Sequence, residues 1–119
     1  MVREQIELLL ASFPVAAVKT GLLCSTEIVE LVASIFAELA TQKIPLVIDP
    51  VMIATSGDRL LEPAAVESYQ SRLFQLATLV TPNMAEAAAI TNLPVTNLAE
   101  MRAAGTVLHD KHGQGVLLH

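Results

Sequence analysis

The sequence predicts an α/β protein built on a parallel sheet, with helices on both faces of the sheet in a three-layer arrangement. Short apolar segments alternate along the chain with longer segments in which apolar residues recur at helical spacing. This alternation is typical of parallel strands joined by helical crossovers. In addition, the segment Leu46–Ile48 is apolar throughout, as expected of a strand buried on both faces. About four strands of such a sheet are present.

The first half of the chain contains two predicted helices and two predicted strands. The first helix ends before Pro14, because proline breaks a helix interior. Ser25 is a suitable N-cap for the second helix, whose apolar residues repeat at helical spacing up to about Gln42. The expected order is a helix at 3–12 with Ile6, Leu9 and Leu10 on its inner face, a strand at 15–18, a loop at 19–21, a helix at 25–42 and a strand ending at Asp49.

The second half contains three predicted helices and two predicted strands. Pro63 suits the first turn of a helix, and Pro82 follows the end of a strand because proline cannot donate to a sheet ladder. The expected order is a helix after Pro63 with Val66, Tyr69, Leu73 and Phe74 inside, a strand at 77–80, a helix at 84–90, a turn at 91–94, a helix at 97–109 and a strand at 116–118.

The composition excludes several classes of partner. The 119 residues carry a formal net charge of -5 and contain no basic cluster, which argues against nucleic-acid binding. No apolar run approaches the roughly 20 residues needed to cross a bilayer, so no membrane partner is expected. The single cysteine cannot form an internal disulfide, which favours a reducing compartment and hence the cytoplasm.

Polar residues follow two of the predicted strands, at the edge where open α/β sheets bind their ligands. Asp49 ends one strand, Asn83 follows the next, and Glu86 lies about one helical turn beyond Asn83. Carboxylate and amide oxygens suit magnesium-bound water, because magnesium keeps several waters and takes few protein ligands. The same spacing fits an N-cap at Asn83 with Glu86 as its capping box. Spacing alone favours the capping box, and both roles can hold at once.

Three runs of sequence extend this pattern to a family. They are Val-Lys-Thr-Gly-Leu-Leu at 18–23, Asp-Pro-Val-Met-Ile-Ala-Thr-Ser-Gly-Asp-Arg-Leu-Leu at 49–61 and Val-Thr-Pro-Asn-Met-Ala-Glu-Ala at 80–87. Together they resemble the hydroxymethylpyrimidine/phosphomethylpyrimidine kinases of the ribokinase-like superfamily. The pair Asn83 and Glu86 alone would indicate only the superfamily. The continuation Ser-Gly-Asp at 56–58 is more specific, because the related pyridoxal kinases usually have an acidic residue soon after the methionine.

The resemblance implies a reaction and a set of site residues. The reaction is ATP-dependent phosphorylation of 4-amino-5-hydroxymethyl-2-methylpyrimidine and of its monophosphate in thiamine diphosphate biosynthesis, with Mg²⁺ as cofactor. Asp49, Asn83 and Glu86 would lie in the phosphate and metal region, with Asn83 and Glu86 reaching the metal through water. Val51 and Leu22 would contact the pyrimidine, Leu22 at a position where the family often has methionine. Core packing is an equally open role for Val51.

The resemblance covers residues 1–119 as the central part of one kinase domain, since family members are longer. They end in a glycine-rich anion-hole motif that carries the catalytic residue, and they usually have lysine at the position of His119. We therefore expect the catalytic residue outside this sequence, an inactive isolated chain, and self-association through an exposed sheet edge. Two other interpretations stay open, a non-catalytic binding or assembly fragment and a pyridoxal kinase-like enzyme.

Four further residues with reactive or charged side chains are given minor roles. Lys19 is either a surface lysine or a phosphate contact, and Cys24 is either a buried thiol or a thiol at a helix start. His109 and His112 are three residues apart, but no third ligand accompanies them at zinc spacing.

Overall fold

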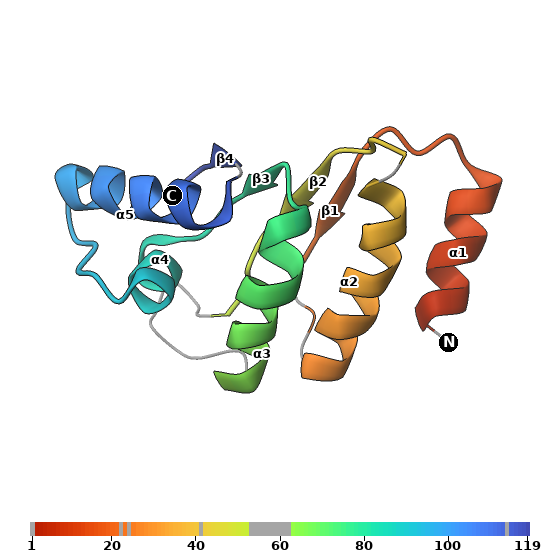
Figure 1. Ribbon diagram of the computed structural model, residues 1–119, viewed down its shortest axis with the longest axis horizontal. Coiled ribbons are helices and arrows are strands. Elements are labelled where there is room, and N and C mark those ends of the chain that lie inside the picture. The colour runs from red at the N-terminus through yellow and green to blue at the C-terminus, as the bar shows by residue number, and fades with distance from the viewer. Residues whose placement is uncertain (1, 22, 24, 41, 53–62, 114) are drawn as a thin grey trace.

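A computed structural model describes residues 2–21, 23, 25–40, 42–52, 63–113 and 115–119 of the chain. Four parallel strands form one sheet in the order β1-β2-β3-β4, and α3, α2 and α1 lie side by side in Figure 1 with α1 outermost, beyond the β1 edge. The strands are β1 (Val18–Thr20), β2 (Leu46–Ile48), β3 (Leu79–Val80) and β4 (Gly115–Val116). The α-helices are α1 (Val2–Ser12), α2 (Thr26–Ala40), α3 (Pro63–Ser68), α4 (Met84–Thr91) and α5 (Leu98–His112). The predicted α/β class and four-stranded parallel sheet are confirmed.

The main core lies on one face of this sheet. Leu46, Ile48 and Val80 are at most 5% exposed there and pack with side chains from all five helices. Because side chains alternate across a strand, the opposite face carries the residues in register with Val47, which are Lys19, Leu79 and Gly115. Val47 and Leu79 are half-buried, whereas Lys19 and Gly115 are exposed. The described residues therefore cover this second face only in part.

The first two helices begin and pack differently. In α2 the Ser25 hydroxyl accepts a hydrogen bond from the backbone N–H of Ile28 at 3.3 Å, so the predicted N-cap is confirmed. α1 occupies the predicted segment but has no buried residue, and Leu9, expected on its inner face, is 55% exposed. α1 is held to the core by Ile6 and Leu10. No helix among the described residues combines the length and the hydrophobicity that crossing a bilayer requires.

The helix that starts at Pro63 changes its winding along its length. After α3 the chain continues as a π-helix over Tyr69–Leu73 and a 3₁₀ turn over Phe74–Leu76. The backbone N–H of Phe74 donates to the carbonyl of Tyr69, five residues earlier. Both rings are fully buried, with their centroids 6.2 Å apart. The wider winding thus turns two large side chains toward the same core, and the predicted inner face is confirmed for Tyr69, Leu73 and Phe74, while Val66 is half-buried.

The first strand lies later in the chain than predicted. Residues 15–17 are outside the strand, and β1 includes Lys19 and Thr20, which were expected in a loop. The reason is the pairing with β2, in which Val18 aligns with Leu46 and its N–H donates to the Pro45 carbonyl at 3.0 Å. The apolar run at 15–18 therefore did not predict the start of β1, because a short strand begins where its residues pair with the neighbouring strand.

The C-terminal boundaries also differ from the prediction. α5 continues to His112 instead of ending at 109, and it stops at Gly113, whose φ of 77° is left-handed. Glycine adopts this conformation without steric cost, so it commonly ends helices. β4 is Gly115–Val116 instead of 116–118, because Gly115 already aligns with Leu79.

Candidate functional site

The loops that follow β2 and β3 meet at the carboxyl edge of the sheet. Asp49 follows β2 directly, and Thr81, Pro82 and Asn83 follow β3. The ladder continues past the strands, since the N–H of Thr81 donates to the Ile48 carbonyl at 3.0 Å. Because β2 and β3 are parallel neighbours, Asp49 and Asn83 lie at the same edge of the sheet, as predicted.

Glu86 joins these two loops with hydrogen bonds from both carboxylate oxygens. Its Oε1 accepts from the N–H of Asn83, and its Oε2 accepts from the N–H of Met52, each at 2.8 Å. In return, the Asn83 Oδ1 accepts from the N–H of Glu86 at 2.7 Å, which completes a capping box at the start of α4. Glu86 is 2% exposed. The capping box is therefore present, and the same carboxylate also fixes the loop after β2.

This arrangement limits what the site can offer an anion. The N–H groups of Glu86 and Ala87 donate to the side chain and the carbonyl of Asn83, and the N–H of Met84 donates to the His119 carbonyl at 3.1 Å. Three of the first N–H groups of α4 thus already have partners within the chain. A carboxylate oxygen accepts from metal-bound water as it does from N–H groups. The donor set fits a water-mediated Mg²⁺ site better than direct anion binding at the helix end.

Asp49 and Val51 lie in the loop that Glu86 fixes. Asp49 is half-buried, and its carbonyl accepts from the N–H of Val51 at 2.9 Å, so the chain turns sharply at Pro50. Met52 is fully buried, whereas Val51 is half-buried. Val51 therefore contributes apolar surface at the carboxyl edge and is compatible with both roles predicted for it.

Three residues at this edge were not among the predicted site residues. They are Met52, whose backbone N–H bonds to Glu86, Thr20, and His119. Thr20 is 5% exposed, aligns with Ile48, and its hydroxyl has no hydrogen-bond partner among the described residues. The ring Nε2 of His119 lies 3.1 Å from the Thr81 carbonyl oxygen. The position of His119 could be found only from the pairing of β3 with β4. Val116 aligns with Val80, so residue 119 falls opposite residue 83.

Several predicted residues are not brought into the site. Leu22, Cys24 and the Ser-Gly-Asp segment at 56–58 lie outside the described residues. Lys19 is exposed and lies on the second face of the sheet. Both His109 and His112 belong to α5. Within the described ranges, no group of three or more histidine, cysteine, aspartate and glutamate side chains could hold a metal ion.

Comparison with protein families gives a match along the whole chain. A family model described as phosphomethylpyrimidine kinase matches residues 1–119. The hydroxymethylpyrimidine/phosphomethylpyrimidine kinase of Mycobacterium tuberculosis is 42% identical over 118 residues, which cover 99% of this chain and 42% of that protein. The corresponding kinase of Synechococcus elongatus is 36% identical over 117 residues, covering 98% of this chain and 43% of the relative. The chain thus spans less than half the length of these curated relatives.

Solved structures agree with the ribokinase-like fold. The crystal structure of a phosphomethylpyrimidine kinase from Clostridium difficile superposes with a TM-score of 0.84 at 34% identity, covering 98% of this chain and 50% of that one. An ADP complex of a pyridoxal kinase from Bacillus subtilis also reaches a TM-score of 0.84, at 30% identity, covering 98% of this chain and 43% of the other.

Proposed function

The chain belongs to the phosphomethylpyrimidine kinase family, and we propose that it supplies the carboxyl-edge half of a kinase site that binds a pyrimidine and ATP. The reaction is phosphoryl transfer from ATP to the hydroxymethyl oxygen of 4-amino-5-hydroxymethyl-2-methylpyrimidine and to the phosphate of its monophosphate, a cytoplasmic step of thiamine diphosphate biosynthesis. The observation that carries this proposal is the Glu86 carboxylate. Its two oxygens accept hydrogen bonds from the N–H of Met52, after β2, and from the N–H of Asn83, after β3, each at 2.8 Å.

Each site residue then has a defined task. Asn83 and Glu86 would hold Mg²⁺ through water, and Asp49 would lie beside the phosphates. Bound Mg²⁺ would neutralise the charge of the transferring phosphoryl group, which is the main requirement of this chemistry. Val51 and Leu22 give apolar contacts to the pyrimidine ring. Because the chain spans only 42% of the Mycobacterium tuberculosis kinase, we expect it by itself to show no turnover.

The experiment compares the isolated chain with a chimera. In the chimera, residues 1–119 replace the matching half of the Clostridium difficile kinase, which supplies the remaining half of the fold. We expect steady ADP release from ATP and hydroxymethylpyrimidine only in the chimera. Preorganised groups that stabilise charge contribute roughly a factor of a hundred to a thousand each, so the isolated chain should fall below detection. ADP release by the isolated chain would overturn the expectation of inactivity, and a folded but inactive chimera would favour a non-catalytic binding fragment.

A pyridoxal kinase-like activity is the second candidate, because the Bacillus subtilis pyridoxal kinase superposes as well as the phosphomethylpyrimidine kinase does. The same chimera distinguishes the two when it is given pyridoxal in place of hydroxymethylpyrimidine. We expect the higher kcat/KM with hydroxymethylpyrimidine. The reverse order would assign the segment to pyridoxal phosphorylation.

A further inference from the structure

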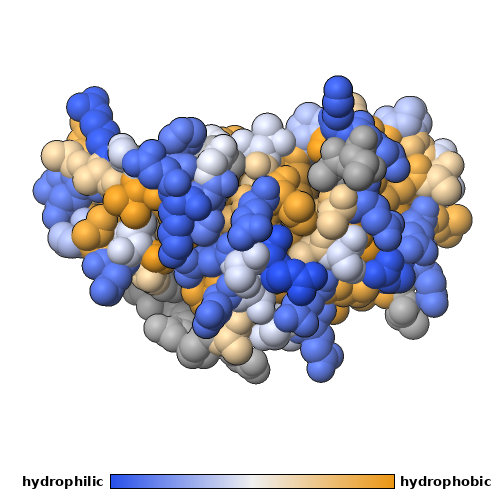
Figure 2. Space-filling view, viewed as in Figure 1, coloured by the Kyte–Doolittle hydropathy of each residue, from blue (hydrophilic) through white to orange (hydrophobic). Residues whose placement is uncertain are grey.

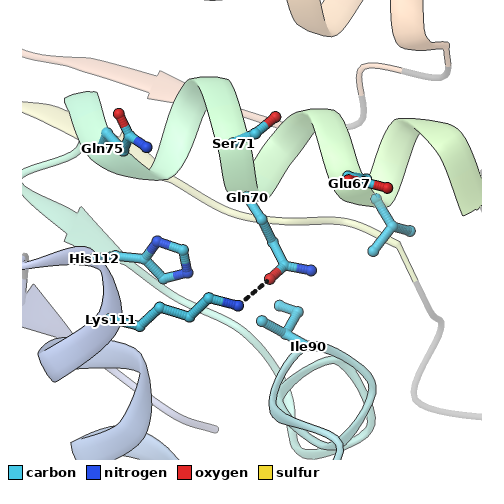
Figure 3. A pocket seen from close by; sticks show the side chains of 8 residues that line it. Glu67, Gln70, Ser71, Gln75, Ile90, Lys111 and His112 are labelled. Carbon is cyan, nitrogen blue, oxygen red and sulfur yellow. Dashed lines mark hydrogen bonds between the residues drawn. The ribbon is translucent and has the colours of Figure 1, made fainter.

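The strand β4 is anchored where the chain leaves α5. The ring of His112, the last residue of α5, packs against Phe74 in a T-shaped arrangement with the centroids 5.2 Å apart. Burial, and secondarily the charge of Lys111, lower the pKa of His112 below its ordinary value, which favours a neutral ring in this contact. Figure 3 shows the neighbouring Lys111, whose ammonium donates to the Gln70 Oε1 at 3.3 Å. The last turn of α5 is thus attached to the helix that follows Pro63, which fixes the start of β4 relative to the core.

From this start, the pairing of β4 with the chain beside it continues to His119. Alternate N–H groups donate to alternate carbonyls, at 3.1 Å from Gly115 to Thr78, at 2.9 Å from Leu117 to Val80 and at 3.3 Å from His119 to Pro82. The ladder therefore extends beyond β3 and β4 themselves. It brings His119 to the start of α4, at the carboxyl edge of the sheet.

His119 makes contacts on both sides of Asn83. Before Asn83, the His119 ring Nε2 lies 3.1 Å from the Thr81 carbonyl oxygen, and the His119 N–H donates to the Pro82 carbonyl. After Asn83, the N–H of Met84 donates to the His119 carbonyl at 3.1 Å. A carbonyl oxygen only accepts, so the ring contact requires the proton on Nε2. The other two contacts use backbone atoms of residue 119, and only the ring contact depends on its side chain.

The ring supplies a donor that the sheet cannot. The register of β2 and β3 continues to Asp49 opposite Thr81, so a regular parallel ladder would have residue 50 donate to the Thr81 carbonyl. Residue 50 is proline and has no N–H. Pro82 has none either, so the carbonyl is the only group by which a hydrogen bond can orient the peptide between Thr81 and Pro82. The His119 ring therefore orients a peptide group that two prolines deprive of backbone donors.

We propose that His119 is a positioning residue of the candidate kinase site. Its ring replaces the missing ladder donor, fixes the peptide between Thr81 and Pro82, and thereby holds Asn83 in the orientation in which Asn83 caps α4 and meets Glu86. His119 acts through Thr81 in this role. The consequence for the reaction rests on the proposed function, in which Asn83 and Glu86 would hold Mg²⁺ through water.

The first test is NMR of the isotope-labelled chain, and it needs no catalytic activity. Ring ¹⁵N signals should show the neutral His119 with its proton on Nε2. His119→Gln keeps a side-chain N–H at the reach of Nε2, whereas His119→Asn places it at the reach of Nδ1. We expect the Thr81 carbonyl ¹³C signal to move upfield in His119→Asn and to stay in place in His119→Gln. A proton on Nδ1, or the same carbonyl signal in both variants, would overturn the proposal.

The second test uses the chimeric kinase and a magnesium titration below the melting temperature of each variant. His119→Asn should raise the Mg²⁺ concentration needed for half-maximal rate about two- to tenfold, the range expected from one hydrogen bond. His119→Gln should stay within about twofold of the parent. His109→Asn is the control, because His109 is exposed on α5, away from the carboxyl edge, and it should leave the titration unchanged.

The two tests separate this proposal from the proposed function. An inactive parent chimera would count against the proposed function, and the Thr81 carbonyl signal would still decide whether the His119 ring holds the peptide. In an active chimera, a magnesium titration that is unaltered by His119→Asn, or altered equally by His119→Gln, would show that the ring contact does not position the site, and the proposal would then be wrong.

Discussion

At the scale of single residues, Glu86 has the most closely defined role in this protein. It is 2% exposed, and its two oxygens accept from backbone N–H groups that belong to two different loops. A buried N–H that loses its acceptor costs more than the bond itself contributes, because it also loses water. Glu86 therefore acts on the structure of the candidate site whether or not Mg²⁺ is bound.

The first prediction concerns stability. Glu86→Gln should lower the free energy of unfolding by about 1–3 kcal/mol, because glutamine has one acceptor oxygen and its NH₂ would face a backbone N–H. The measurement is urea unfolding followed by circular dichroism. Glu100→Gln is the matched control, since Glu100 bonds at the N-terminus of α5 as Glu86 does in α4 but its contacts are exposed. We expect a change below about 0.5 kcal/mol there, and equal losses would contradict the role assigned to Glu86.

The second prediction separates structural from metal-related roles of Glu86. In the chimeric kinase, Glu86→Gln should lower turnover and raise the Mg²⁺ concentration needed for half-maximal rate, because it removes a carboxylate charge from the proposed metal site. The assay is ADP release across a magnesium titration below the melting temperature of the variant. A variant with lower stability but an unaltered magnesium titration would leave Glu86 with the capping and loop-fixing role alone.

At the scale of elements, the end of α5 depends on one backbone conformation. Gly113 has a φ of 77°, and its N–H donates to the His109 carbonyl at 2.7 Å, which closes the last turn. A Cβ added at Gly113 would meet no atom within 4 Å. Substitution there therefore tests the conformational preference of the backbone without a steric clash.

We predict that Gly113→Ala lowers the free energy of unfolding by about 1–2 kcal/mol, the usual cost of a left-handed conformation for a residue with a Cβ. Thermal unfolding should show a melting temperature several degrees lower. Gly21→Ala is the control, because its Cβ would also meet open space while its φ lies outside the left-handed region. An unchanged melting temperature for Gly113→Ala would mean that the turn after α5 readily adopts another conformation.

At the scale of the whole molecule, apolar surface is concentrated near α1 and β1. Leu8, Leu9 and Phe13 are 68%, 55% and 62% exposed, and Figure 2 shows hydrophobic surface among hydrophilic side chains on the side where α1 lies. Leu9 also lines an apolar cleft of about 320 Å³ that reaches β1, which is an edge strand of the described sheet. Exposed apolar surface next to a strand edge favours association between chains.

We therefore predict that the chain self-associates in a concentration-dependent manner. Light scattering and thermal unfolding across a concentration series measure this. Leu9→Gln should reduce association, because it places a polar group in the cleft beside β1. Leu98→Gln is the matched control, since Leu98 is 61% exposed on a different helix. A monomer at high concentration with a concentration-independent melt would show that the exposed edge and cleft do not drive association.

The sequence by itself determined the α/β class, the order of the elements and the residues placed at the carboxyl edge. These features depend on local pattern: Pro50 and Pro82 end strands, Asn83 starts a helix, and apolar residues repeat with the period of each element. The family resemblance, carried by the runs at 18–23, 49–61 and 80–87, is confirmed by the match over the whole chain.

Only the tertiary structure decided the features that depend on partners far away in sequence. β1 begins at Val18 because it pairs with Leu46, and no property of residues 15–20 alone specifies that register. The Oε2 of Glu86 bonds to the N–H of Met52, 34 residues away, and His119 reaches Thr81 through the parallel alignment of β3 and β4. Local propensity acts over a few residues, whereas register and buried hydrogen bonds are settled when the strands pack together.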